Sequence, residues 1–235
     1  MQKIKLSIII PCYNEVKNIP IIINKFNTII NRDDIELILV DNGSTDSTNE
    51  LLKKIIHKYS FLRTVTIKTN KGYGYGITYG FKIAKGEFLS YTHADMQTDP
   101  SDVLKGLKII ERQNDSCNCY VKGNRKGRPL FDQCFTIGMS IFETIYLREK
   151  LLDINAQPNI FHKDYFNKLS NIPKDFSIDL YLLYMAKKIG LRVIRFNVSF
   201  PERIHGQSKW NTSLLAKYKF IIRTISFSYN MKKYI

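Results

Sequence analysis

The first hundred residues alternate between short apolar runs and longer segments with helical spacing, and this alternation limits the fold more than any other feature. The predicted strands are apolar or alternate in polarity, and lie at residues 6–10, 37–40, 64–69 and 88–92. The predicted helices follow them in turn, at residues 18–30, 46–59, 76–84 and 100–113. This order predicts an α/β fold, with a mostly parallel central sheet and helices on both faces.

The second half of the chain is less regular. Its predicted helices lie at residues 135–152, 177–188 and 212–229, with a strand at 191–196 and loops at 122–133 and 202–210. We therefore expect one domain over residues 1–210 and a basic amphipathic C-terminal helix or tail over residues 211–235.

Polar or glycine-rich residues follow each of the first four predicted strands. These segments are residues 11–15, 41–46, 70–76 and 93–99. Since parallel strands end at the same edge of a sheet, and ligands of such sheets bind beyond that edge, we expect the four segments to form one site.

One of these segments carries candidate metal ligands. Asp95 and Gln97 are two residues apart, so in extended backbone their oxygens face the same way. Oxygen ligands suit a hard divalent cation that keeps positions for water and diphosphate. An acid at a strand end is more often a helix cap or a loop residue, and that interpretation stays open.

Two further loops offer cations and glycines. Residues 203–210 hold Arg203, Lys209, a glycine and a serine. This composition suits a phosphate clamp as well as an ordinary basic surface loop, and both interpretations stay open. Residues 123–128 are similar. The glycines at residues 70–76 allow a close approach to a ligand, but they follow the third strand and not the first, which excludes a Rossmann dinucleotide site.

The net charge of +15 over 235 residues fits partners that are nucleic acid, anionic lipid or phosphorylated substrates. No recognisable nucleic-acid-binding module is present, so we expect no nucleic acid partner. After Glu202 there are seven Lys or Arg residues and no acid, which favours peripheral contact of the last helix with an anionic membrane, unless its apolar side packs on the domain. Without a signal peptide or spanning segment, we expect a cytoplasmic protein at the inner face of the membrane.

Five short motifs, in order, carry a family resemblance. They are residues 7–15 (SIIIPCYNE), 40–46 (VDNGSTD), 70–74 (NKGYG), 94–97 (ADMQ) and 203–209 (RIHGQSK). Together they resemble the family 2 glycosyltransferases, specifically the dolichyl-phosphate mannose synthase-like group of polyprenyl-phosphate glycosyltransferases. The resemblance covers residues 6 to about 210.

The resemblance implies a GT-A fold and a metal-dependent, inverting hexosyltransferase that uses a nucleotide sugar, with GDP or UDP left open. It assigns the nucleoside to Pro11, Tyr13, Glu15, Val40 and Asp41, with Ala94 touching it through backbone. Asp95 and Gln97 would bind Mg²⁺ or Mn²⁺, and Arg125, Arg203 and Lys209 would meet phosphates. The residues expected to act in catalysis are Asp95, Asp179 and Arg203.

The sequence departs from the family pattern at two positions, and the transmembrane tail of some relatives is absent. His93 replaces the first aspartate of the DxD-like motif, and Asn42 replaces a common second aspartate. The acceptor also stays open. A polyprenyl phosphate needs no general base, whereas a hydroxyl of a polysaccharide does. Asp179 would supply that base, or it lies in the first turn of its helix, where the dipole favours a carboxylate.

Overall fold

A single mixed sheet forms the centre of the molecule in the computed structural model, which describes residues 3–201 and 214–233. Within those residues the sheet has seven strands in the order β3-β2-β1-β4-β6-β5-β7. The strands are β1 (Leu6–Cys12), β2 (Ile35–Asn42), β3 (Leu62–Ile67), β4 (Phe88–Tyr91), β5 (Cys119–Lys126), β6 (Asn159–His162) and β7 (Arg192–Ser199).

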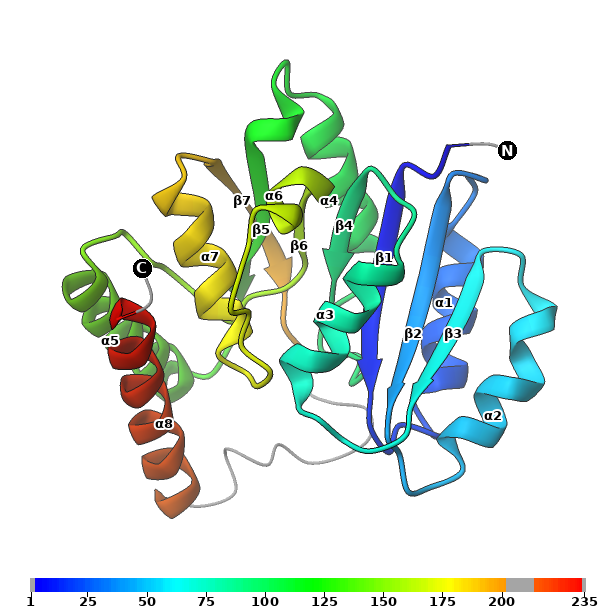
Figure 1. Cartoon of the computed structure of the whole chain (residues 1–235), viewed down its shortest axis with the longest axis horizontal. Helices are drawn as coiled ribbons and strands as arrows, with labels where there is room; N and C mark the ends of the chain where they lie inside the picture. The colour runs from blue at the N-terminus through cyan, green and yellow to red at the C-terminus, as the bar shows by residue number, and fades with distance from the viewer. Residues whose placement is uncertain (1–2, 202–213, 234–235) are drawn as a thin grey trace.

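The strand directions bring most carboxyl ends together. β1 is parallel to β2 and β4, and β2 is parallel to β3. β6 is antiparallel to both β4 and β5, and β5 is parallel to β7. Every strand except β6 therefore ends at the same side of the sheet, the lower side in Figure 1, which we call the carboxyl edge. The prediction of a mostly parallel α/β fold is confirmed.

Helices cover both faces of the sheet (Figure 1). On one face lie α1 (Ile19–Ile29), α2 (Thr48–Ile55) and α4 (Pro100–Glu111), and their apolar side chains form one buried cluster with the sheet. On the other face lie α3 (Tyr73–Ile83), α6 (Lys163–Asn167) and α7 (Ile178–Lys188), with a second cluster. Short 3₁₀ turns occupy Ile56–Lys58 and Ser116–Asn118.

The place of β1 in the sheet explains why its sequence is apolar except at Ser7. Ile8 and Ile10 belong to the cluster under α1 and α4, whereas Ile9 between them belongs to the cluster under α3. Because successive side chains of a strand point to opposite faces, a strand covered on both sides favours apolar residues at successive positions.

Two helices stand away from the sheet. α5 (Leu130–Leu147) and α8 (Leu214–Lys233) pack side by side (Figure 1), and the buried Glu143 carboxylate accepts the Ser228 hydroxyl between them. Among the described helices, none combines the length and the apolar composition that a bilayer crossing requires. The predicted loop at 202–210 and the domain boundary at residue 210 fall outside the described residues, so the separate tail stays a prediction.

Several predicted boundaries are wrong. Residues 122–126 belong to β5 and not to a loop. The prediction missed the strand because Lys122 looks like a loop residue in the sequence, whereas in the fold it is buried. α5 begins at Leu130 and ends at Leu147, earlier than predicted at both ends. α3 begins at Tyr73, three residues before the prediction, and α8 continues to Lys233, past its predicted end at residue 229, whereas its predicted start at residue 212 lies outside the described residues. The four-residue strand β6 was not predicted.

Candidate functional site

The loops after β1 and β2 are joined by the side chain of Asn14. Its amide nitrogen donates to Thr45 Oγ1 at 3.2 Å, and its Oδ1 accepts from the backbone nitrogens of Thr45 and Asp46 at 2.8 and 3.3 Å. Its own backbone nitrogen donates to Ser44 Oγ at 3.0 Å. Asn14 has φ of 60°, a left-handed conformation that asparagine tolerates better than most residues. The two loops therefore form one unit at the carboxyl edge.

Asp41 lies at the end of β2 and is 1% exposed. Its Oδ1 accepts from the backbone nitrogen of Ser44 at 3.0 Å, and its Oδ2 from Asn49 Nδ2 at 2.9 Å. The carboxylate thus stabilises the turn that follows the strand. Because each carboxylate oxygen has a second lone pair, these bonds do not prevent a further hydrogen bond. Contact of Asp41 with a nucleoside stays a prediction.

The other residues predicted to hold the nucleoside differ in exposure. Tyr13 and Glu15 are half-buried in the loop after β1, and Glu15 Oε2 accepts from Asn18 Nδ2 at 2.6 Å. Val40 is 0% exposed and Ala94 5%, so neither side chain has room for a ligand and only their backbone remains for one. Pro11 is half-buried at the end of β1.

The thiol of Cys12 reports the charge of this region. Burial, followed by the nearby carboxylates of Glu15 and Asp41, raises its pKa well above the ordinary value. The two predicted nucleoside-binding carboxylates therefore both lie near this thiol at the end of β1. Negative charge there favours hydrogen-bond donors, which bases and ribose hydroxyls provide.

Asn42, one of the departures from the family pattern, holds the loop after β3. Its Nδ2 donates to Gly72 O at 2.8 Å, and its Oδ1 accepts from the backbone nitrogen of Lys71 at 3.3 Å. An amide both donates and accepts here, which an ionised aspartate cannot do. Asn42 is therefore explained by the contact between the two loops.

The glycines after β3 were expected to let a ligand approach the backbone closely. In the structure it is a segment of the protein itself, before α7, that packs against them. A Cβ on Gly72 would lie 2.3 Å from Lys174 O, and one on Gly74 would lie 2.4 Å from Pro173 O. The backbone nitrogen of Tyr75, in the first turn of α3, donates to Lys174 O at 3.0 Å. This segment before α7 thus covers the start of α3, where a phosphate would otherwise find N–H donors.

His93, the other departure, belongs to a stack of rings. Tyr73 stacks on His93 with centroids 5.4 Å apart and on Phe176 with centroids 4.6 Å apart. The Tyr73 hydroxyl lies 3.3 Å from His93 Nδ1, and Arg223 of α8 lies over the ring of Phe176 at 5.7 Å. The stack joins the loop after β4 to α3, to the segment before α7 and to α8.

Asp95 and Gln97 do not lie in extended backbone, so that part of the prediction is wrong. Met96 between them has φ of 61°, and the Gln97 backbone nitrogen donates to Asp95 Oδ1 at 3.1 Å, which closes a tight turn. Gln97 Nε2 donates to Pro201 O at 3.4 Å, which brings the end of the described chain after β7 to this loop.

The donor set of this turn still fits a hard divalent cation. Asp95 is half-buried and carries carboxylate oxygens, and Gln97, whose Nε2 donates to Pro201 O, carries an amide oxygen. Within the described residues no three His, Cys, Asp or Glu side chains gather as a metal cluster. Two oxygen ligands alone leave most coordination positions to water and diphosphate.

The predicted phosphate-binding cations have different outcomes. Arg125, at the end of β5, is bound by Asp153: its backbone nitrogen donates to Oδ2 at 2.8 Å and its Nε to Oδ1 at 2.9 Å. Its ring contact is with Phe200 at 5.1 Å. Its charge is therefore balanced within the protein, and contact with a phosphate stays a prediction. Arg203 and Lys209 lie outside the described residues.

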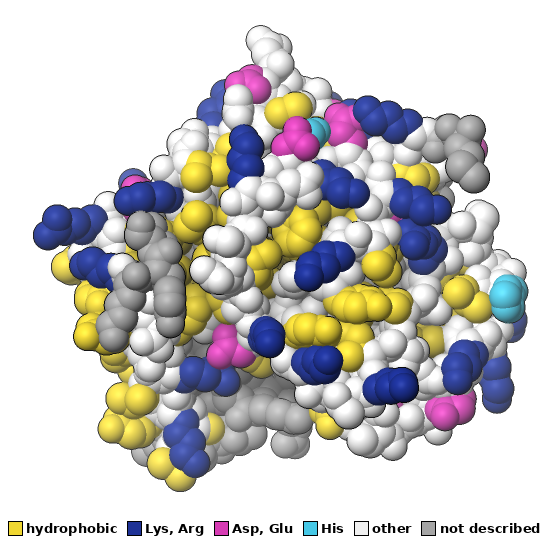
Figure 2. Space-filling view, viewed as in Figure 1, with side chains coloured by type: hydrophobic (Ala, Val, Ile, Leu, Met, Phe, Trp, Pro, Cys, Tyr) yellow, Lys and Arg dark blue, Asp and Glu magenta, His cyan; other side chains and the backbone are white. Residues whose placement is uncertain are grey.

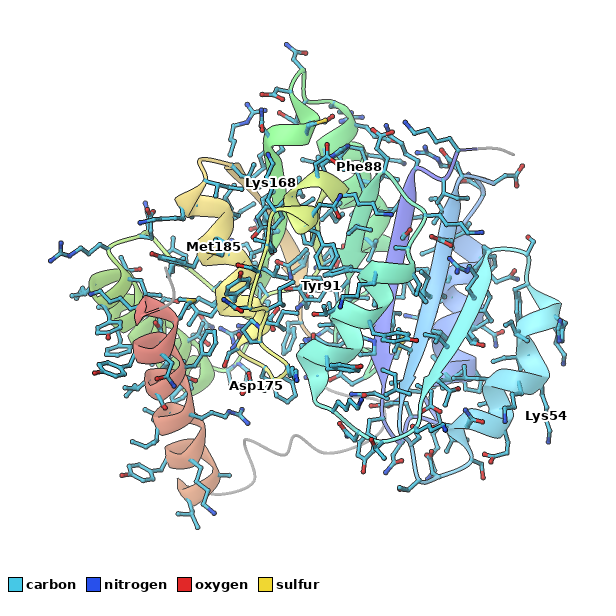
Figure 3. All side chains as sticks on the ribbon, viewed as in Figure 1. Lys54, Phe88, Tyr91, Lys168, Asp175 and Met185 are labelled. Atoms are coloured by element: carbon cyan, nitrogen blue, oxygen red, sulfur yellow. The ribbon has the colours of Figure 1, made fainter. Side chains whose placement is uncertain are left out.

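Asp179 lies in the first turn of α7 and is 2% exposed. Its Oδ1 accepts from the Tyr91 hydroxyl at 2.7 Å and from Gln157 Nε2 at 2.8 Å. Tyr91 ends β4 at the centre of the molecule (Figure 3), two residues before His93. The carboxylate is thus fixed beside the end of β4, and its role as a base stays a prediction.

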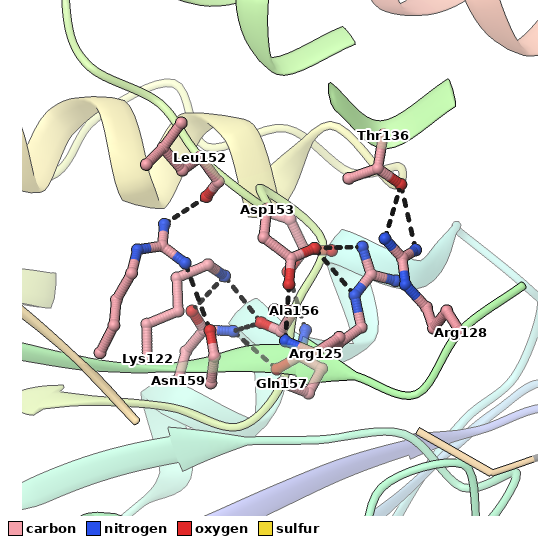
Figure 4. A network of polar contacts seen from close by, with 12 residues as sticks. Lys122, Arg125, Arg128, Thr136, Leu152, Asp153, Ala156, Gln157 and Asn159 are labelled. Carbon is pink, nitrogen blue, oxygen red and sulfur yellow. Dashed lines mark hydrogen bonds and ion pairs between the residues drawn. The ribbon is translucent and has the colours of Figure 1, made fainter. Parts of the chain in front are cut away.

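Sequence reasoning missed several residues around Asp179. Tyr91, Lys122, Gln157 and Asn159 are buried and hydrogen-bonded, and Figure 4 shows the last three. Buried tyrosine, lysine and amide side chains look like surface or core residues in a sequence. Only the placement of a lysine directly after the short apolar run at residues 119–121 could have drawn attention to them.

Comparison with known proteins gives consistent results. The profile of the family described as "Glycosyl transferase family 2" matches residues 7–169. The chain is 26% identical to the dolichol-phosphate mannosyltransferase of Pyrococcus furiosus over 220 residues, which is 91% of this chain and 61% of that protein. It is 24% identical to the dolichyl-phosphate beta-glucosyltransferase of Dictyostelium discoideum over 223 residues, 86% of this chain and 68% of that protein.

Solved structures show the same fold. Glucosyl-3-phosphoglycerate synthase from Mycobacterium tuberculosis, in complex with Mn²⁺, UDP and phosphoglyceric acid, superimposes with a TM-score of 0.73 and 17% identity. The match covers 95% of this chain and 78% of that one. The GT-A fold that the sequence motifs implied is therefore confirmed.

Proposed function

This chain belongs to glycosyl transferase family 2, and from that premise we propose that it transfers a sugar from a nucleotide sugar to a polyprenyl phosphate. The observation that carries the proposal is the convergence of the four loops at the carboxyl edge. Asn14 joins the first two loops, Asn42 joins the second to the third, and the Tyr73–His93 stack joins the third to the fourth.

The residues of this edge suit the parts of a nucleotide sugar. The carboxylates of Glu15 and Asp41 accept hydrogen bonds from the base and ribose, and the backbone of Val40 and Ala94 lies beside them. Asp95 and Gln97 hold the divalent cation, Mg²⁺ or Mn²⁺, which when bound would neutralise the charge of the departing diphosphate. Arg203 and, if Asp153 releases it, Arg125 meet the remaining phosphate charge.

A lipid-linked acceptor is supported by the surface of α5 and α8. Large apolar side chains are exposed on both helices: Leu130 is 79% exposed, Ile145 72%, Leu215 61% and Tyr218 61%. Lys219 and Arg223 are exposed on α8 beside them. Figure 2 shows apolar side chains gathered together with basic ones at the side of the molecule where these helices lie. An apolar face flanked by cations fits an anionic membrane surface.

The relatives support the same acceptor class by their names, one acting on dolichol phosphate and one on dolichyl phosphate. The chain spans 61% of the length of the archaeal relative and 68% of the amoebal one. Activity, donor and acceptor are therefore proposals for this chain, and the choice between GDP and UDP is part of the test.

The test is a transfer assay with radiolabelled nucleotide sugars. With Mn²⁺ and a polyprenyl phosphate, label from a GDP- or UDP-sugar should become extractable into organic solvent. The matched control replaces the polyprenyl phosphate with the polyprenol, which lacks the phosphate. Absence of extractable label with every common donor would contradict the proposal.

Membrane contact has its own test. The protein should float with vesicles that contain anionic phospholipid and not with vesicles of neutral lipid. Replacing two exposed apolar residues, Ile145→Glu and Leu215→Glu, should abolish flotation, whereas a glutamate at the exposed residue Ser226 of α8 should weaken it less. Equal flotation of wild type and double variant would contradict the contact.

The buried carboxylate of Asp179 favours a second candidate, transfer to a hydroxyl of a lipid-linked or surface polysaccharide. A hydroxyl nucleophile needs a base, whereas a phosphate acceptor is already an anion. Asp179→Asn discriminates between the two. Loss of turnover with intact donor binding favours the hydroxyl acceptor, and retained turnover favours the phosphate.

A further inference from the structure

Lys122 is a lysine with no exposed surface in the middle of β5. Its Nζ donates to Ala156 O and to Asn159 Oδ1, both at 2.7 Å (Figure 4), and it makes no ion pair with a described carboxylate. An amine buried without a carboxylate beside it is costly, so a role that keeps it in place is expected. Burial lowers its pKa to about 7, and the nearby Asp179 and Asp153 act against Arg195 and Arg125 on that value.

Hydrogen bonds continue from Lys122 toward α7. Asn159 Nδ2 donates to Gln157 Oε1 at 2.6 Å, and Gln157 Nε2 donates to Asp179 Oδ1 at 2.8 Å. We call these four side chains, Lys122, Asn159, Gln157 and Asp179, the buried relay. The backbone of residues 156–158 can pass close to β5 because residue 123 is glycine: a Cβ there would lie 2.1 Å from Gln157 O.

The donor and acceptor atoms of the relay fix the direction in which its hydrogen bonds run. Ala156 O accepts from both Lys122 Nζ and Asn159 Nδ2, the latter at 3.2 Å. Because a carbonyl oxygen only accepts, the nitrogen of Asn159 must face it and the oxygen of Asn159 must face Lys122. Gln157 must then turn its oxygen to Asn159 and its nitrogen to Asp179. Each link donates toward the carboxylate, so the bonds polarise one another in the same sense.

At its far end the relay holds one oxygen of the carboxylate. Oδ1 of Asp179 takes the bonds from both Gln157 and Tyr91, whereas Oδ2 has no hydrogen bond from any residue in the described part of the chain. We propose that Lys122, Asn159 and Gln157 are positioning residues for Asp179: they link a buried amine to the carboxylate, fix Oδ1, and leave Oδ2 for a hydroxyl of the bound substrates. Only this last clause rests on the proposed function, in its second form with a hydroxyl acceptor.

The first test measures stability and needs no substrate. Urea unfolding is followed for Lys122→Met, Asp179→Asn and the double variant, each with Gln157 intact and with Gln157→Leu. With Gln157 intact, the double variant should lose about tenfold less in the folding equilibrium constant than the two single losses multiplied together. With Gln157→Leu, this coupling should fall to about twofold or less. Multiplicative losses in both series, or undiminished coupling without Gln157, would overturn the proposal.

The second test uses the wild-type chain and stays decisive if a variant fails to fold. The side-chain amide signals of Asn159 and Gln157 are followed by ¹⁵N NMR against pH. Both should titrate with the midpoint of Lys122, near 7. A response of Asn159 alone, which touches Lys122 directly, would contradict a connected relay.

The third test links the relay to transfer. With a hydroxyl acceptor, Gln157→Leu should lower kcat by about 100-fold, because misplacement of a reacting group costs that order, and should leave the KM for the donor nearly unchanged. The matched control is Tyr165→Phe, which removes a buried hydroxyl bonded to Leu182 O in the same core and should keep kcat. If wild type transfers no sugar at all, the proposed function fails, whereas the first two tests still decide the relay.

Discussion

Replacing Asp153 should destabilise the fold strongly, because Arg125 would lose the partner of a buried charge. The side chains of Arg125 and Asp153 are 9% and 12% exposed. Asp153 accepts from the backbone nitrogen, Nε and NH2 of Arg125, so one carboxylate satisfies three donors of one residue. In Asp153→Ala the guanidinium stays buried with no opposite charge.

The magnitude follows from this geometry. Breaking a buried pair by removing one partner costs about 3–5 kcal/mol. For a chain of this size, 1 kcal/mol moves Tm by roughly 2–4 °C, so Tm should fall by roughly 6–20 °C. Removing both charges, in Arg125→Met/Asp153→Ala, should cost much less than Asp153→Ala alone, since no uncompensated charge remains and the strain of alanine at the φ of 38° is common to both variants.

The sign of the pH dependence can also be worked out. Burial works to raise the pKa of Asp153, but the charge and hydrogen bonds of Arg125 outweigh it and hold that pKa below the ordinary value. A lowered pKa in the folded state stabilises the protein in full above the unfolded pKa of ~3.9, and this contribution is lost as pH falls through the folded value. Wild type should therefore lose its advantage over the double variant only in acid.

The assay is thermal and urea unfolding of wild type, Asp153→Ala, Arg125→Met and the double variant at pH 7 and in acid. Lys3→Ala is the control, because Lys3 is 82% exposed in its pair with Glu87 and such surface pairs contribute ~0–1 kcal/mol. If the double variant lost as much stability as the two single variants together, the pair would not be coupled and the reasoning would be wrong.

Three further outcomes are expected. Burial, opposed by the hydrogen bond from Ser228, raises the pKa of Glu143 from 4.5 to about 7, so its stabilising contribution is lost as pH rises across that window. Glu143→Gln should therefore be more stable than wild type at pH 8, by up to about 3 kcal/mol in urea unfolding, and equal stability would refute this. Gly72→Ala should cost at least ~1–2 kcal/mol, since φ is +100° and Lys174 O occupies the Cβ position, whereas Gly138→Ala, with open space around it, should be neutral or slightly stabilising by unfolding. Asp95→Asn should weaken Mn²⁺-dependent donor binding, measured by calorimetry, by at least the roughly 10–100-fold that loss of an outer-shell metal partner costs; unchanged binding would exclude Asp95 as a ligand.

The sequence predicted β1 and β2 from their apolar runs, which are buried because helices lie on each side of them. It also predicted β3 and β7, which are less buried, although with shifted boundaries. β5 was missed because Lys122 reads as a loop residue, although in the fold it is buried and bonded to a distant backbone carbonyl. β6 has four residues, too few for any periodicity.

The candidate site was predicted at the level of loops and less well at the level of side chains. Parallel strand ends must share an edge, which placed Tyr13, Asp41 and Asp95 in one region. The sequence did not reveal that Gly72 makes room for the segment before α7, because that segment lies a hundred residues later. Nor did it reveal that Arg125 is paired, since Asp153 approaches it only in the folded chain.

The most direct measurement is an ¹H–¹⁵N spectrum of the labelled protein titrated with GDP- and UDP-sugars in the presence of Mg²⁺, and of Mn²⁺ where line broadening reports proximity to the metal. One of the nucleotide sugars should shift the amides of Tyr13, Asp41 and Ala94, and Mn²⁺ should broaden Asp95 and Gln97 first. Shifts that cluster at the opposite edge of the sheet, for example near Asn118, or no shifts with any donor, would contradict a sugar-nucleotide site built from these four loops.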